Sequence, residues 1–136
     1  MTPTTSPTPA VWLTLQAADA PALIDYLVET FGFVQTARHG EGDTVDHAEL
    51  LWPEGAGGVM LGSHRPGNVW SREPGTAGGY VVTTDPDTLY ERALRRRAEV
   101  VRPLADTDYG SREFAVRDPE GNLWSFGTYA GTPRTA

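Results

Sequence analysis

The sequence contains no cysteine, which excludes disulfide bonds, thiolate metal sites and cysteine nucleophiles. It also lacks any apolar run approaching the roughly 20 residues that a membrane helix needs. Residues 1–10 alternate threonine, proline and serine, with no basic or apolar stretch, so we do not expect a signal peptide. We therefore expect a cytoplasmic protein that does not associate with membranes.

Positive charge is also scarce. The chain has 11 lysines and arginines against 18 aspartates and glutamates, a formal net charge of -7. This balance argues against nucleic-acid binding, which needs basic side chains to neutralise phosphates. The one basic run, Arg95–Arg97, falls at the end of an expected helix and suits the helix dipole there. The acidic balance is compatible with a cationic ligand or with simple solubility, and both readings stay open.

The length of 136 residues, with 39% hydrophobic and 21% charged residues, fits one soluble domain. We expect a disordered N-terminal tail over residues 1–9, because it has nothing to bury, a single domain over 10–130, and a C-terminal tail over 131–136. Apolar periodicity and turn residues predict a strand, a helix and three strands, at 11–16, 21–31, 33–38, 45–52 and 58–61. The same order returns at 80–84, 87–98, 100–104, 112–117 and 123–126.

The sequence therefore predicts one structural unit that occurs twice. Ala18–Leu23 matches Thr84–Leu89 at the starts of the two predicted helices. The predicted fold is α+β, with two βαβββ modules (residues 10–63 and 78–130) forming curved mixed sheets around a concave cavity. A loop over residues 64–77 joins the modules. We interpret it as a lid with Trp70 as a ligand contact; the alternative is a surface loop whose tryptophan packs on the core.

Two stretches carry a family resemblance: "ETFGF" (Glu29–Phe33) after the first helix and "GSREFAVRDPEGNLWSF" (Gly110–Phe126) at the end. With this element order, the chain resembles the vicinal oxygen chelate superfamily of glyoxalase I, bleomycin resistance proteins, fosfomycin resistance enzymes and extradiol dioxygenases. The final hairpin is most similar to bleomycin resistance proteins. The resemblance spans residues 11–129 and implies the two-module fold and a homodimer. It does not fix an activity, because metalloenzymes and drug-binding proteins share the hairpin.

Enzymes of this superfamily usually hold a divalent metal with histidine and glutamate side chains from four strands. Carried over by spacing, those positions are Trp12, Met60, Gly79 (or Gly78) and Ser125. None of these side chains is an imidazole or a carboxylate, the groups that such a site normally needs. The resemblance therefore implies a member of the superfamily with no metal cofactor.

Strand alternation predicts which side chains share the concave face. The first strand should present alternate residues to it, and apolar walls with a few polar groups are typical of a small-molecule site. Trp70 and Tyr109 would border the pocket from loops. The predicted ligand-binding residues are Trp12, Thr14, Gln16, His47, Glu49, Met60, Trp70, Tyr109 and Ser125.

His47 and Glu49 lie two apart on one expected strand, so both project to the same side. Three interpretations stay open for them: a general acid and base, two ligands of a non-standard divalent metal site, or a polar pair at a wet rim. His39, before a glycine, is expected at a turn and in solvent.

The function that these observations favour is metal-independent binding of a small organic molecule, such as sequestration of an aromatic or cationic antibiotic-like ligand. The alternative is a lyase, isomerase or dioxygenase of the same superfamily that uses His47 and Glu49 on a divalent metal. A third hypothesis is a scaffold whose concave face is covered by another chain.

Overall fold

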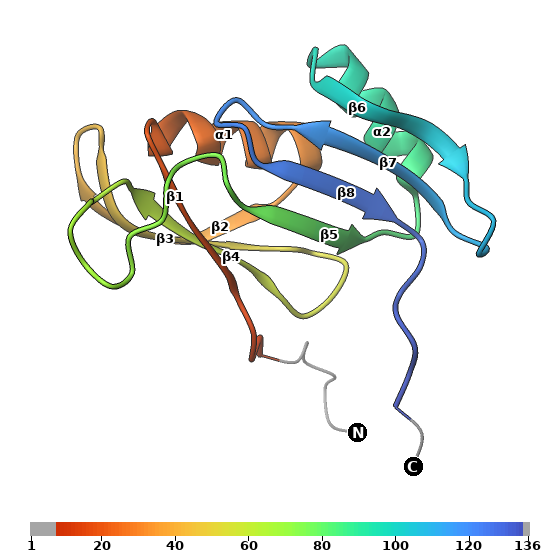
Figure 1. Ribbon diagram of the computed structural model, residues 1–136, viewed down its shortest axis with the longest axis horizontal. Coiled ribbons are helices and arrows are strands. Elements are labelled where there is room, and N and C mark those ends of the chain that lie inside the picture. The colour runs from red at the N-terminus through yellow and green to blue at the C-terminus, as the bar shows by residue number, and fades with distance from the viewer. Residues whose placement is uncertain (1–7, 135–136) are drawn as a thin grey trace, which may run out of the picture.

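A computed structural model describes residues 8–134 and shows two four-stranded sheets side by side (Figure 1). Residues 1–7 of the expected disordered tail lie outside the described residues. The elements are β1 (Leu13–Ala17), α1 (Ala20–Phe31), β2 (Val34–Glu41), β3 (Thr44–Leu51), β4 (Gly58–Ser63), β5 (Gly78–Val82), α2 (Pro86–Arg95), β6 (Glu99–Asp106), β7 (Arg112–Arg117) and β8 (Leu123–Gly127). In Figure 1, α1 lies above the strands of the first module and α2 lies behind β6 and β7, so each sheet has one helix-covered face and one helix-free face.

The two sheets have the same topology. Sheet A has the order β1-β4-β3-β2, and sheet B has the order β5-β8-β7-β6. In each, the first strand pairs in parallel with the last strand of its module, and the other pairs are antiparallel. The predicted α+β fold of two βαβββ modules is therefore confirmed.

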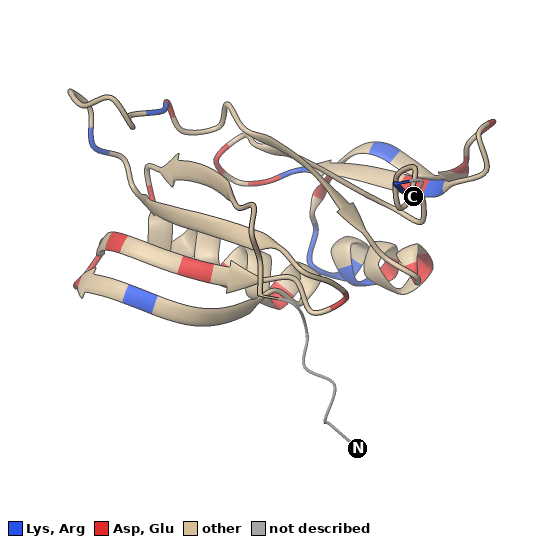
Figure 2. Cartoon of the chain, turned by 90° about the horizontal axis from the view of Figure 1, so that it is seen from below, with Lys and Arg blue, Asp and Glu red and all other residues tan. Residues whose placement is uncertain are grey.

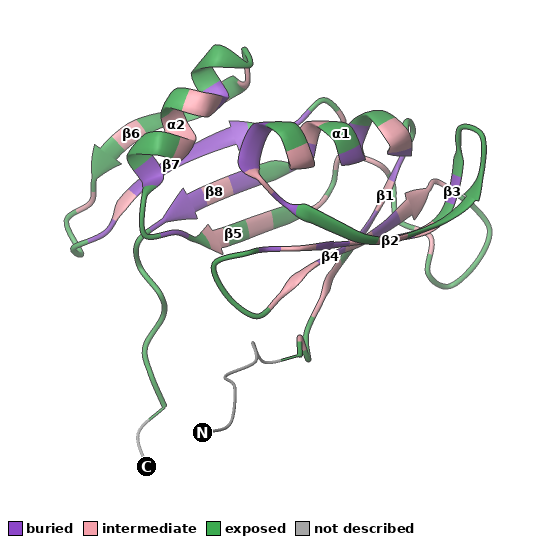
Figure 3. Ribbon diagram, turned by 180° about the vertical axis from the view of Figure 1, so that it is seen from behind, coloured by how far each residue is buried: buried purple, intermediate pink, exposed green. Residues whose placement is uncertain are grey.

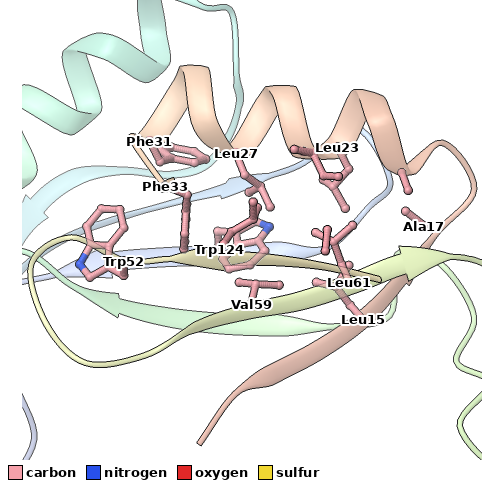
Figure 4. Packing of buried hydrophobic residues seen from close by; sticks show 14 of the residues in the cluster. Leu15, Ala17, Leu23, Leu27, Phe31, Phe33, Trp52, Val59, Leu61 and Trp124 are labelled. Carbon is pink, nitrogen blue, oxygen red and sulfur yellow. The ribbon is translucent and has the colours of Figure 1, made fainter. Parts of the chain in front are cut away.

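Local sequence signals set the bounds of α1. The Asp19 side chain accepts a hydrogen bond from the Ala22 amide and caps the first turn. Gly32 ends the helix with a φ of 85°, a left-handed conformation that glycine adopts without steric cost. Between these caps, Leu23 and Leu27 are fully buried and point toward the sheets (Figure 4).

Helix α2 begins in the same way but ends earlier than the sequence predicts. Asp85 caps it by accepting from the Thr88 amide. The predicted end at Ala98 is wrong, because α2 stops at Arg95 and Arg97 has a φ of 58°. A non-glycine residue in this left-handed region cannot continue a right-handed helix.

The buried core is continuous between the modules. Phe31 at the end of α1 packs on Phe126 of β8 with ring centroids 4.4 Å apart. Phe33 meets Trp124 at 5.9 Å (Figure 4). Trp52 lies 5.9 Å from Phe126, and its indole N–H donates to the Val82 carbonyl oxygen at 2.8 Å. Figure 3 shows buried segments, in purple, in β7, β8 and α1. The modules thus share one core.

Two glutamates bind the modules to each other in a reciprocal manner. The Glu120 carboxylate, in the turn between β7 and β8, accepts from the backbone amides of Ala18 at 2.7 Å and Asp19 at 2.9 Å. The Glu54 carboxylate, in the turn between β3 and β4, accepts from the Thr84 amide at 2.8 Å. Each glutamate thus holds the backbone just before or at the cap of the other module's helix. We call these the reciprocal glutamate contacts.

The turn of the last hairpin is built on Asp118, a buried carboxylate with only 4% of its surface exposed. One oxygen accepts from the amides of Glu120, Gly121 and Asn122 at 2.9–3.0 Å. The other accepts from the Asn122 side chain at 2.9 Å and the Trp124 indole at 2.8 Å. This network fixes the turn between β7 and β8 and links it to the core.

Candidate functional site

The helix-free face of sheet A forms a cavity of about 390 Å³, which we call the sheet-A cavity. Strands β1, β3 and β4 form its floor, and the loop over residues 64–77 forms its rim. Its lining residues are Thr14, Leu15, Gln16, Asp46, His47, Met60, Leu61, Gly62, Ser63, Arg65, Asn68, Trp70 and Arg72.

Strand alternation explains this floor. Thr14 pairs with Met60 in the parallel ladder of β1 and β4, so the two side chains lie next to each other on one face. Their neighbours Leu15 and Leu61 point to the other face and are buried in the core. Five of the nine predicted ligand-binding residues therefore line one cavity: Thr14, Gln16, His47, Met60 and Trp70.

The loop above the cavity is held by its own hydrogen bonds. The Gln16 side-chain oxygen accepts from the amides of Arg65 and Arg72, each at 3.3 Å. Within the loop, the Asn68 side chain accepts from the Trp70 amide at 2.8 Å. Trp70 is 73% exposed, so its ring does not pack on the core as an ordinary surface-loop tryptophan would. Its indole is available to a molecule in the cavity.

His47 and Glu49 bond to each other, with 2.8 Å between His47 Nε2 and Glu49 Oε2. Both side chains are partly exposed, and only His47 lines the cavity. The expectation that His39 lies at a turn is wrong: it belongs to β2, pairs with His47 and stacks on its ring at a centroid distance of 6.4 Å. This hydrogen-bonded His47–Glu49 dyad sits at the edge of the cavity.

Within a single chain, three of the predicted ligand-binding residues lie away from the sheet-A cavity. Trp12 precedes β1, where its ring lies against Gly58, and it does not line the cavity. Ser125 and Tyr109 belong to the module of sheet B. The prediction placed these residues together because it assumed that both concave faces enclose the same space.

On sheet B, tyrosine and glutamate side chains of the same module line the helix-free face. Glu113 is only 7% exposed, and its carboxylate accepts from the hydroxyls of Tyr109 at 2.8 Å and Tyr80 at 3.4 Å. The hydrogen bond to Glu113 raises the pKa of Tyr109, and burial raises the pKa of Tyr80, so both phenols stay protonated and can donate. Tyr80 also donates to the Tyr129 carbonyl oxygen at 2.7 Å.

The residues at the superfamily's metal positions do not fit a divalent ion. Met60 pairs with Thr14 on sheet A, and Ser125 pairs with Tyr80 on sheet B. Gly79 faces the core, because a side-chain carbon there would lie 3.0 Å from the Trp124 ring. Among residues 8–134, no three histidine, aspartate or glutamate side chains come together as a possible metal site. An indole (Trp12), a thioether (Met60), a glycine and a single hydroxyl (Ser125) are poor ligands for the usual divalent metals.

A second cavity, of about 490 Å³, lies between the modules. Its walls include Phe33, Trp52 and Trp124. The polar groups at its edge are already bonded, since the Trp52 indole donates to Val82 and the Glu54 carboxylate binds Thr84. Few groups there remain to orient a ligand, so the sheet-A cavity is the better candidate site.

Sequence reasoning missed the charged residues of the sheet-A cavity. Arg65, Arg72 and Asp46 all line it, although neither strand alternation nor aromatic residues indicated them. The available signal was the position of the two arginines on either side of Trp70 in a loop already assigned as a lid.

Two packed βαβββ modules with an open cavity on one sheet define a scaffold whose activity depends on its site residues. The chain belongs to the Glyoxalase/Bleomycin resistance protein/Dioxygenase superfamily, whose family model matches residues 10–126. The resemblance inferred from the two quoted stretches is therefore confirmed. None of the described helices is long and apolar enough to span a membrane.

Several known proteins are similar to this chain. An uncharacterized protein of Mycobacterium bovis is 35% identical over 127 residues, which covers 88% of this chain and 82% of the relative. TioX from Micromonospora sp. ML1 has a TM-score of 0.70 and 32% identity, covering 90% of this chain and 98% of TioX. TnmS3, described as an antibiotic-binding protein from Streptomyces sp. CB03234, has a TM-score of 0.69 and 22% identity, covering 85% of this chain and 90% of TnmS3. At that identity, TnmS3 supports the fold alone.

Proposed function

We propose that this protein binds a small aromatic molecule in the sheet-A cavity without a metal and without changing it chemically. The main support is the exposed indole of Trp70, which a bonded loop holds beside an open cavity. Thr14, Gln16 and His47 offer polar groups that can orient a ligand. Stacking on an aromatic side chain, with a few polar contacts, is a common way to bind planar organic molecules.

The superfamily contains both binding proteins and enzymes, and the residues favour binding. The metal positions carry poor ligands, and the solved structure of TnmS3, of the same fold, is described as antibiotic-binding. We extend that role to this chain as sequestration: a planar ligand is held away from its target by burial of its apolar surface.

Changing Trp70→Ala is expected to weaken binding of a planar aromatic ligand by about tenfold, because stacking on one aromatic side chain contributes on the order of 1–3 kcal/mol. Isothermal titration with a panel of planar aromatic antibiotics measures this effect. Val69→Ala is the matched control, since Val69 is exposed beside Trp70 but does not line the cavity. The proposal fails if no member of the panel binds or raises the melting temperature at millimolar concentration.

The rival function is a lyase, isomerase or dioxygenase with a divalent metal on His47 and Glu49. The dyad is formed, but its two groups bond each other and have no third partner of the usual type among the described residues. Elemental analysis of the freshly purified protein separates the two functions. A stoichiometric metal that is lost in His47→Ala would support the enzyme and overturn the proposal above.

We also propose a homodimer in which the helix-free face of sheet B meets a second copy. This face exposes Tyr80, Leu123, Tyr109 and Tyr129, an apolar patch with no cover from its own helix. In that arrangement Tyr109 and Ser125 would border the partner's sheet-A cavity.

The Leu123→Arg variant should sediment as a monomer in analytical ultracentrifugation, whereas Leu94→Arg, on the exposed side of α2, should remain dimeric. A wild-type monomer at micromolar concentration would contradict the proposal.

A further inference from the structure

Arg72 is a cation of the sheet-A cavity that has no carboxylate partner. It lines the cavity from the loop, two residues after Trp70 in the chain. Its Nη1 donates to the carbonyl oxygens of Ser71 at 2.8 Å and Val69 at 3.4 Å. Among the described residues, no aspartate or glutamate oxygen lies within 4.0 Å of its guanidinium. Nε and Nη2 are therefore free to donate to a ligand.

The other charged residues that line the cavity have partners. Arg65 forms an ion pair with Asp46, and both line the cavity. His47 is bonded to Glu49 at 2.8 Å, and Glu49 lies outside the lining. Arg72 is thus the one lining residue, among those described, that offers an uncompensated full charge. Figure 2 shows the basic segments of this loop in blue.

The backbone of Arg72 is also fixed in place. Its amide donates to the Gln16 side chain, which simultaneously holds the Arg65 amide. The loop therefore presents both a guanidinium and an indole to the same cavity. A guanidinium matches the geometry of a carboxylate and can bind it with two parallel hydrogen bonds.

We infer that the ligand of the sheet-A cavity is an aromatic molecule bearing a carboxylate, with its ring on Trp70 and its carboxylate on Arg72. This inference rests on the proposed function and adds the chemical class of the ligand. It replaces the cationic ligand suggested by the net charge of the whole chain. Exposed charges farther than about 8–10 Å are largely screened at physiological salt, so the nearest free charge decides the preference.

The test compares three probes of the same ring system by isothermal titration: anthracene-9-carboxylate, anthracene-9-carboxamide and 9-(aminomethyl)anthracene. Wild-type protein is expected to bind the carboxylate about fivefold more tightly than the amide, since a partly exposed ion pair contributes up to about 1 kcal/mol. Arg72→Gln should remove this preference. Arg38→Gln is the matched control, because Arg38 is exposed on β2 of the same sheet, outside the cavity, and should keep the preference.

The outcomes separate this inference from the proposed function. If the three probes bind equally, or if the ammonium binds best, the inference is overturned while aromatic binding stands. A preference that persists in Arg72→Gln would also overturn it, because another group would then hold the carboxylate. If no probe binds at millimolar concentration, the inference and the proposed function both fail. Thermal melting of each variant confirms that it is folded.

Discussion

Changing Asp118→Ala is expected to lower the free energy of unfolding by about 3–4 kcal/mol, since a buried hydrogen-bonding group would leave its donors unsatisfied. The Asp118 carboxylate accepts five hydrogen bonds: three from backbone amides of the turn, one from the Asn122 side chain and one from the Trp124 indole. The indole and the Asn122 side chain are buried, so water cannot easily replace the lost acceptor. Urea unfolding, followed by tryptophan fluorescence, measures the change.

Two controls define the cause of this loss. Asp118→Asn keeps the shape but offers an N–H₂ group where one oxygen now accepts, so we expect a smaller loss of about 2 kcal/mol. Asp108→Ala changes an exposed aspartate of the loop between β6 and β7 and should stay within about 0.5 kcal/mol of the wild type. A loss of less than 1 kcal/mol in Asp118→Ala, taken as roughly one ordinary hydrogen bond, would show that the turn does not depend on the carboxylate.

Changing Phe126→Ala is expected to cost about 3–5 kcal/mol, the usual range for removal of a buried phenylalanine ring. Phe126 is completely buried. The centroid of its ring lies 4.4 Å from the ring centroid of Phe31 and 5.9 Å from that of Trp52, both in the first module. The centroid distance to Phe114 of its own module is 5.2 Å. The cavity left behind would therefore open at the contact between the modules, where both sides lose packing.

Because the modules share this core, wild-type unfolding should be one transition, with coincident curves from circular dichroism and fluorescence. Phe126→Leu keeps most of the volume and should cost about 1–1.5 kcal/mol, which keeps the experiment informative if the alanine variant does not fold. Two separate transitions in the wild type would mean that the modules are stable alone and that Phe126 does not couple them.

Local signals explain how much of the fold the sequence could predict. The predicted helix over 21–31 agrees closely with α1 (Ala20–Phe31), because its caps, Asp19 and Gly32, act within a few residues. The end of α2 was mispredicted because Arg97 adopts a left-handed conformation that its residue type does not signal. The last hairpin was predicted well, since Asp118 and Gly121 mark its turn.

The candidate site was harder to predict, because it depends on where loops and sheets lie in space. Alternation correctly grouped Thr14 with Met60, whose strands pair directly. It grouped Trp12 with them as well, although the strand begins only at Leu13 and the indole lies against Gly58. Arg72 was missed because only the folded loop brings its side chain to the cavity.

The reciprocal glutamate contacts hold the modules together while leaving the helix-free faces of sheets A and B able to differ. Glu120 holds the first module and Glu54 holds the second, which is the pattern that a two-fold axis imposes on identical subunits. Because one peptide chain joins the two modules, they need not be identical. Their sequences can therefore differ while the reciprocal glutamate contacts are kept. The helix-free face of sheet A has a cavity lined by Arg72 and Trp70, whereas the helix-free face of sheet B carries Tyr80 and Tyr109.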